Sequence, residues 1–185
     1  GHATLGVIIL AAAVLFSTTK IIMWSQQPYF MALDLPKQYY GVFMSIGWAL
    51  GGLSSHSAHL IDGKIKIFSA LFLAFCASIV ACFGASIILG FHGIPLLLTG
   101  GSCIFGMMLP RVNEAINKNI GSERRATALS TLTLLGSALF IPISSLVGWV
   151  TDQTTIQWGL MTLCAWLILS GTGLMWLKIK RAKTA

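Results

Sequence analysis

The chain has few charged residues and no long polar segment. Only 9% of its 185 residues are charged, and five of them are acidic, whereas about a quarter of residues are charged in an ordinary soluble domain. Hydrophobic residues make up 56% of the chain, and the mean hydropathy is +0.83. This balance excludes an ordinary water-soluble domain and indicates a membrane protein.

Motifs for metal binding, disulfide frameworks and hydrolysis are also missing. The four cysteines form no Cys-x-x-Cys pair and fall inside apolar stretches, which favours buried free thiols. No Gly-x-Ser-x-Gly motif occurs, and the spacing of His56 and His59 favours helix packing over an incomplete metal site. We therefore expect no enzyme activity, no cofactor and no metal. The net charge of +7 comes from scattered residues, so we expect no nucleic-acid partner.

Long apolar runs predict six transmembrane helices. Each run has about 20 residues or more, enough to cross roughly 30 Å of hydrocarbon at 1.5 Å per residue, and all are too long for strands. The expected spans cover residues 5–33, 38–61, 66–91, 94–117, 126–150 and 156–178. We expect an all-α integral membrane fold, a single transmembrane domain over residues 3–185. The chain has no initiator Met, and Gly1 and His2 read as a tag remnant, so we expect a piece of a longer protein.

The positions of Lys and Arg predict the orientation in the membrane. Lys37 alone lies on one side of the predicted spans, whereas nine basic residues lie on the other. These nine are Lys64, Lys66, Lys118, Arg124, Arg125, Lys178, Lys180, Arg181 and Lys183. Because basic loops stay on the cytoplasmic side, both termini are predicted to be cytoplasmic. Six spans with both ends inside divide into two sets of three with opposite orientation, the topology of two inverted three-helix repeats.

One region resembles a known transporter family. The segment from Ile116 to Ser130 contains Arg125-Ala126-Thr127-Ala128-Leu129-Ser130, and the next helix closes with Gly148-Trp149-Val150-Thr151-Asp152. Both are similar to the tenth and eleventh helices, and the loop between them, of bacterial major facilitator superfamily transporters. Arg124, Arg125 and Thr127 would then form the cytoplasmic loop motif. The resemblance covers the whole chain by topology, and its specific residues lie between Pro110 and Asp152.

The resemblance implies the carboxyl-terminal half of a major facilitator fold, in the bacterial inner (plasma) membrane. Such a half would help to move a small organic solute by alternating access, driven by a proton or solute gradient. Its expected partners are a small-molecule substrate, the lipid bilayer, and either the missing amino-terminal six helices or a second copy of the chain. The alternative is a non-transporting scaffold or assembly protein with a transporter-like fold.

Lys20 is the most informative single residue. It lies near the middle of the first span, where an unpartnered ammonium costs at least a few kcal/mol, so it must face protein or water. Ser17, Lys20, Trp24 and Gln27 share one helix face by spacing. In the resembled family the corresponding helix lines the central cavity, which implies that this face is the substrate wall. The alternative is that Lys20 neutralises a buried acid or snorkels.

A second charged face is expected on the fourth span. Arg111, Glu114 and Lys118 follow one another at three and four residues, and Glu114 precedes Lys118 in the favourable order for a helical ion pair. Two interpretations stand side by side. The residues form either an inner gate that closes by ion pairs to the missing half, or a static interfacial ion pair.

The remaining signals concern helix packing. Gly47, Gly51 and Ser55 predict a seam of small residues, whose partner is either another span or the missing half. Polar residues on the fifth span either face the cavity or bond to their own helix backbone. These are Ser130, Thr133, Ser137 and Ser144. The third and sixth spans lack charge over residues 68–89 and 156–177, which predicts outer, lipid-facing supports.

Overall fold

The computed structural model describes residues 2–60 and 64–183, with side chains for residues 5–60 and 64–180, and this part of the chain forms helices and no strand. The long helices are α1 (His2–Ala32), α2 (Tyr40–Ser57), α3 (Ile67–Ile87), α6 (Ser122–Gln153) and α7 (Ile156–Lys183). One further helical segment joins α4 (Gly93–Leu98), the π-helical η3 (Thr99–Cys103) and α5 (Ile104–Asn119). Short 3-10 turns, η1 (Lys37–Tyr39) and η2 (Ala58–Leu60), flank α2. The expected all-α architecture is confirmed.

Several helix ends differ from the expected ones. α1 already includes His2, and α3 ends at Ile87, four residues before the expected end of the third span. α6 begins at Ser122 rather than at residue 126. Its first turn is polar and carries Glu123, whose negative charge is favourable at a helix amino terminus. The hydrophobic run therefore marked only the apolar part of this helix.

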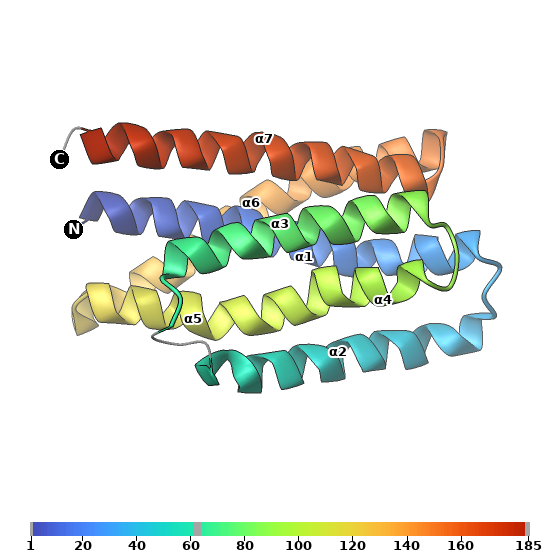
Figure 1. Cartoon of the computed structure of the whole chain (residues 1–185), viewed down its shortest axis with the longest axis horizontal. Helices are drawn as coiled ribbons and strands as arrows, with labels where there is room; N and C mark the ends of the chain where they lie inside the picture. Colours follow the sequence, from blue (N-terminus) through green and yellow to red (C-terminus); the bar gives the residue numbers. More distant parts are fainter. Residues whose placement is uncertain (1, 61–63, 184–185) are drawn as a thin grey trace.

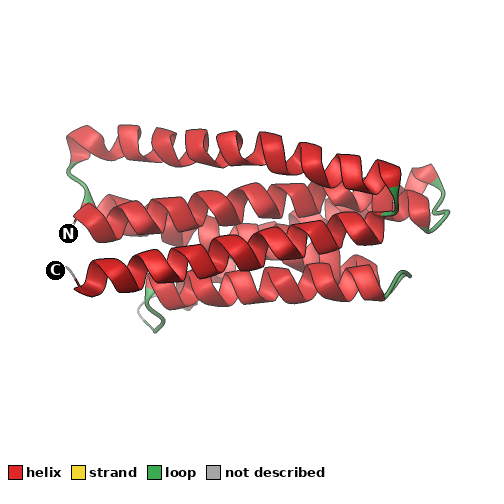
Figure 2. Ribbon diagram, turned by 90° about the horizontal axis from the view of Figure 1, so that it is seen from above, coloured by secondary structure: helices red, strands yellow, loops and turns green. Residues whose placement is uncertain are grey.

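The helices run along one common axis, and both termini lie at the same end of the bundle, called here the termini end (Figure 1). The view from above shows the same alignment (Figure 2). Five of the helical segments are long and apolar enough to cross a membrane: α1, α3, α4 to α5, α6 and α7. α2 is not among these five. It is shorter and carries glycine, serine and histidine residues that lower its apolar content.

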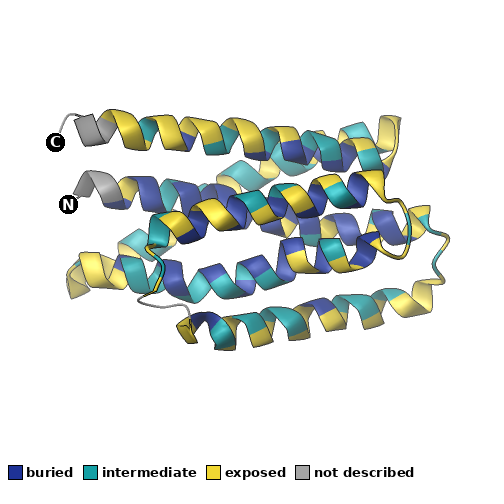
Figure 3. Ribbon diagram, in the orientation of Figure 1, coloured by how far each residue is buried: buried dark blue, intermediate teal, exposed yellow. Residues whose placement is uncertain are grey.

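α1 is the central helix of the bundle. Of the residues in its most apolar stretch, 78% are buried, against 11% in α6 and 22% in α7. It packs against α3, α5, α6 and α7, and the dark ribbon of buried residues follows it along most of its length (Figure 3). α3 and α7 pack closely against each other on one side of α1, whereas α5 and then α2 lie on another. Any site on α1 can therefore open only where these neighbours leave a gap.

Tyr29 fixes the end of α1 that lies opposite the termini. Its side chain is fully buried, and its hydroxyl donates a hydrogen bond to the carbonyl oxygen of Ile88 at 2.8 Å. The same hydroxyl accepts a hydrogen bond from the backbone N–H of Gly90 at 3.2 Å. These bonds satisfy backbone groups of the α3–α4 loop and hold that loop against α1.

A seam of small residues joins α2 to the η3–α5 segment. A Cβ atom at Gly47 would lie 3.1 Å from the Ser102 hydroxyl oxygen, and one at Gly51 would lie 3.0 Å from the Ser102 carbonyl oxygen. A Cβ atom at Gly106 would overlap the carbonyl oxygen of Gly51. The partner of the predicted seam is therefore another span of this chain. Ser55 is exposed and lies outside these contacts.

The seam predicts a contrast between two glycines. Gly106→Ala should lower the free energy of unfolding by about 1 to 3 kcal/mol, the usual cost of overpacking, because the new methyl group meets backbone. Gly52→Ala is the matched control, since a Cβ atom there meets nothing within 4 Å and alanine is the better helix former. Thermal unfolding in detergent micelles would measure both. Equal effects of the two variants would contradict the close α2–α5 contact.

Candidate binding groove

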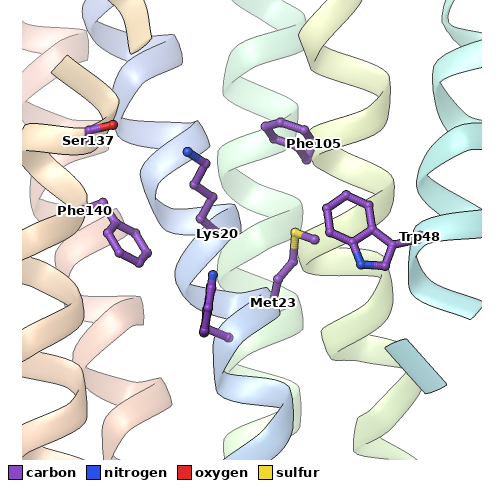
Figure 4. A pocket seen from close by; sticks show the side chains of 7 residues that line it. Lys20, Met23, Trp48, Phe105, Ser137 and Phe140 are labelled. Carbon is purple, nitrogen blue, oxygen red and sulfur yellow. The ribbon is translucent and has the colours of Figure 1, made fainter. Parts of the chain in front are cut away.

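A groove opens on one face of the bundle. In the described part of the chain α2 and α6 make no contact with each other, and α1 and α5 lie between them. The resulting cavity has a volume of about 430 Å³. It is lined by Lys20, Met23 and Trp24 of α1, Trp48 of α2, Phe105 of α5, and Ser137 and Phe140 of α6 (Figure 4). These seven residues define the groove.

One stripe of α1 is left uncovered along the groove side. The exposed residues Lys20, Trp24, Gln27 and Met31 follow at intervals of four, three and four, which places them on one face of the helix. The Trp24 side chain is 70% exposed although its helix is the most buried of the bundle. Most residues beside the stripe are buried, whereas Met23 and Pro28 are half-buried. Within the described structure, a ligand can therefore reach this half of α1 mainly along the stripe and at the adjacent Met23.

Lys20 brings a positive charge to mid-depth. It lies three residues, or about 5 Å along the axis, from the midpoint of α1. Among the described residues no carboxylate forms an ion pair with its ammonium group. An ammonium at this depth is unfavourable in hydrocarbon by at least a few kcal/mol, so it requires water or a polar ligand in the groove. Its side chain extends into the space between α1 and α6, where Ser137 also lies (Figure 4).

The π-helical segment η3 passes close to the groove. A Cβ atom at Gly101 would lie 2.9 Å from Cγ of Met23, and one at Gly100 would overlap Ala81 of α3. The two glycines therefore let the helix approach α1 and α3 at the depth where Met23 lines the groove. A π-helical turn inserts one extra residue into the helix and is frequent at functional sites.

The predicted substrate wall is only partly assembled. Lys20 and Trp24 line the groove together. Ser17 is buried, and its hydroxyl donates a hydrogen bond to the Val14 carbonyl oxygen at 2.8 Å, so it does not reach the groove. Gln27 is exposed farther along the stripe, where its Nε2 donates to the sulfur of Met44 at 3.6 Å. That contact links α1 to α2 beyond the groove.

Of the α6 hydroxyl residues expected either to face the cavity or to bond to their own helix, one lines the groove and three bond to the helix backbone. Ser137 lines the groove. The hydroxyl groups of Ser130, Thr133 and Ser144 donate hydrogen bonds to carbonyl oxygens of their own helix three or four residues earlier. For these three the sequence pattern reflects backbone satisfaction.

The aromatic walls of the groove were missed by sequence reasoning. Trp48, Phe105 and Phe140 come from three different helices, and no periodicity within one helix shows that they converge. A signal existed for Trp48, because it follows Gly47 directly. The glycine seam sets which face of α2 meets α5, and the next residue then lies about 100° around the helix, toward the open side.

The three charged residues expected to share one face of α5 have different environments. Arg111 is 6% exposed, and its Nη2 donates a hydrogen bond of 2.7 Å to the carbonyl oxygen of Ile65, just before α3. Glu114 and Lys118 form the expected ion pair one turn apart, and both side chains are well exposed. Arg111 therefore anchors α5 to the segment that leads into α3. The ion pair, being exposed, adds little to stability.

Arg124, Arg125 and Thr127 belong to a helix rather than a loop. All three lie in the first two turns of α6, which begins at Ser122. The Arg125 Nε donates a hydrogen bond to the Ile120 carbonyl oxygen at 3.2 Å, and the Thr127 carbonyl oxygen accepts from Ser130. In the described structure these residues shape the α5–α6 turn.

The fold and the groove define a class of protein: a multi-pass α-helical membrane protein with a polar and aromatic groove on one face. No protein-family model matches the chain, and no curated protein or solved structure is found to be similar to it. The function must therefore be argued from the groove itself.

Cysteine labelling tests the uncovered stripe. In a background without the four native cysteines, Lys20→Cys should react with a hydrophilic thiol reagent roughly ten times faster or more than Ser17→Cys, because reactivity requires an accessible thiolate. The two positions lie one turn apart, so they differ mainly in exposure. Reaction would be followed by mass spectrometry of the intact protein. Similar rates would show that the groove does not open at Lys20.

Arg111 and Lys118 should differ in their effects on stability. Arg111→Gln removes a buried charged donor and should lower the free energy of unfolding by about 1.5 to 3 kcal/mol. Lys118→Gln breaks an exposed ion pair and should change the free energy of unfolding by about 0.5 kcal/mol or less. Chemical unfolding in mixed micelles would measure both variants. An Arg111→Gln protein as stable as the unmodified chain would exclude the anchoring role.

Proposed function

We propose that the chain is the carboxyl-terminal six-helix half of a secondary active transporter, and that the groove is its share of the substrate site. The observation that carries the proposal is Lys20, exposed near mid-depth of the central helix and without a carboxylate partner among the described residues. Ionisable groups at this depth commonly mark solute pathways, because their desolvation is tolerated only where they serve a polar ligand or partner.

The shape of the groove supports a second half. The groove is open along one side, so a bilayer in direct contact would place hydrocarbon next to the Lys20 ammonium. A covering six-helix unit would enclose it, with one wall of the cavity supplied by α1, α2, α5 and α6. Alternating access then requires the two units to rock about the enclosed site. The covering unit is either a distinct amino-terminal half or a second copy of the chain.

The order of helices is compatible with the resembled major facilitator transporters. α1 corresponds to the helix that lines the central cavity in that family, and it is the helix that supplies three of the groove residues here. α1 to α3 and α4 to α7 would be the two inverted repeats. We place the protein in a bacterial inner membrane, with the termini end and its basic residues on the cytoplasmic side.

The lining of the groove favours an organic anion or zwitterion with an apolar body. Lys20 offers one positive charge, and Trp24, Trp48, Phe105 and Phe140 offer aromatic surface. A volume of about 430 Å³ lies within the usual range of small-molecule sites, roughly 300 to 1,000 Å³. An ammonium next to aromatic rings suits a carboxylate or phosphate attached to a planar or aliphatic group. A proton or solute gradient would drive its accumulation.

Uptake into proteoliposomes tests the proposal. Purified protein, with any six-helix partner that co-purifies, would be reconstituted and offered aromatic and aliphatic organic acids under an imposed proton gradient. Lys20→Gln should reduce accumulation about tenfold or more, the effect of losing roughly one charge-assisted hydrogen bond. Lys37→Gln is the control, because Lys37 is exposed in η1 and does not line the groove.

The outcomes separate the alternatives. Uptake that is lost in Lys20→Gln and kept in Lys37→Gln supports both transport and the groove. Equal uptake by the unmodified protein and Lys20→Gln would keep transport but reject the groove as its site. If no solute moves under any gradient, the scaffold alternative becomes the better description.

A further inference from the structure

A second cavity lies on the face formed by α3 and α7, the helices that lack charge over residues 68–87 and 156–177. It runs between α3 and α7 and has a volume of about 640 Å³. Val7 and Ala11 of α1 are among its lining residues, so the furrow reaches the central helix. Its walls include Phe72 and Cys76 of α3, and Gly171 and Met175 of α7. This α3–α7 furrow shares no lining residue with the groove.

The furrow matches one leaflet of a bilayer in length and depth. Its lining extends from Phe68 to Ile79 on α3 and from Leu167 to Ile179 on α7. These stretches rise about 17 to 18 Å, which is close to half of a hydrocarbon core of roughly 30 Å. Both stretches reach the termini end of the bundle. Phe68 is the second residue of α3, and Ile179 lies near the carboxyl end of α7. In a bilayer the furrow would therefore lie beside the lipid tails of the leaflet on that side.

A cation stands at the mouth of the furrow. Lys178 lines its termini end, and the Lys178 Nζ lies 4.5 Å from the centroid of the Phe68 ring. This contact holds the ammonium over the opening. Among the described residues no carboxylate pairs with Lys178. Lys64 and Lys66, just before α3, add positive charge at the same end of the bundle.

We propose that the α3–α7 furrow binds an anionic phospholipid, with one acyl chain along the furrow and the phosphate on Lys178. The apolar walls suit a hydrocarbon chain, and the length fits a chain that begins at the headgroup level and ends near mid-membrane. The charge at the mouth selects an anionic headgroup, as basic pockets between membrane helices do on the cytoplasmic side. This site does not depend on the proposed transport function.

Native mass spectrometry of the whole chain would test the site, with lipid titrated into detergent micelles. Phosphatidylglycerol should be retained in preference to phosphatidylcholine of the same acyl chains. Lys178→Gln should weaken phosphatidylglycerol retention about fivefold, the factor expected for one lysine near an anionic surface. Lys180→Gln is the matched control, because it removes the same charge two residues away and Lys180 does not line the furrow. If both variants lost phosphatidylglycerol equally, the retention would be due to general surface charge, and the proposed lipid site would be wrong.

A second variant tests the acyl-chain part of the proposal. A Cβ atom at Gly171 would lie 3.6 Å from Phe75, an ordinary contact, and Gly171 lines the furrow, so we expect the further carbon atoms of Gly171→Leu to occupy the open volume of the furrow. It should reduce retention of phosphatidylglycerol while the thermal unfolding temperature stays close to that of the unmodified chain. Soluble glycerol phosphate should not displace the lipid. Displacement by glycerol phosphate, unchanged retention in Gly171→Leu, or a dimer that excludes lipid would each overturn the proposal.

Discussion

The positive charge of Lys20 is the constraint on which the arrangement of this bundle depends. α1 is packed on nearly every side, yet an ammonium near its midpoint cannot be enclosed by apolar side chains without a large loss of hydration energy. The helix is accordingly open along one stripe, from Lys20 to Met31, and most of the residues beside that stripe are buried. A gap between α2 and α6 follows from the same requirement, since either helix would cover the charge if it moved inward.

Close backbone contact sets the walls of that gap. Gly51 and Gly106 let α2 lie directly on α5, so α2 is held to one side of the groove rather than across it. On the other side, α6 touches its neighbours through a narrow stripe that includes Leu132 and Gly136, and most of its surface stays uncovered. The α2 wall is thus set by glycine contacts, and the α6 wall by apolar side chains such as Leu132 and Val147. Trp48 and Phe140 face the groove from these two walls.

Lys20 and Lys178 have different surroundings because they lie at different depths along the bundle. Lys20 lies near the middle of its helix, where lipid headgroups are out of reach, so its charge requires a partner inside a protein cavity. Lys178 lies near the end of α7, at the level where headgroup phosphates are available, and its ammonium lies over the Phe68 ring. The same residue type is thus the basis of the proposed solute site on one face and of the proposed lipid site on the other.

The sequence by itself determined the helical architecture, because apolar runs long enough to span a bilayer leave no alternative to helices. It also determined that Lys20 and Trp24 share an accessible face and that Glu114 pairs with Lys118, since both follow from spacing within one helix. Only the tertiary structure decided that Ser17 is buried, that Arg111 anchors the segment before α3, and that Trp48, Phe105 and Phe140 meet around Lys20. These facts depend on how helices distant in sequence rotate and pack, and periodicity within a single helix carries no information about its neighbours.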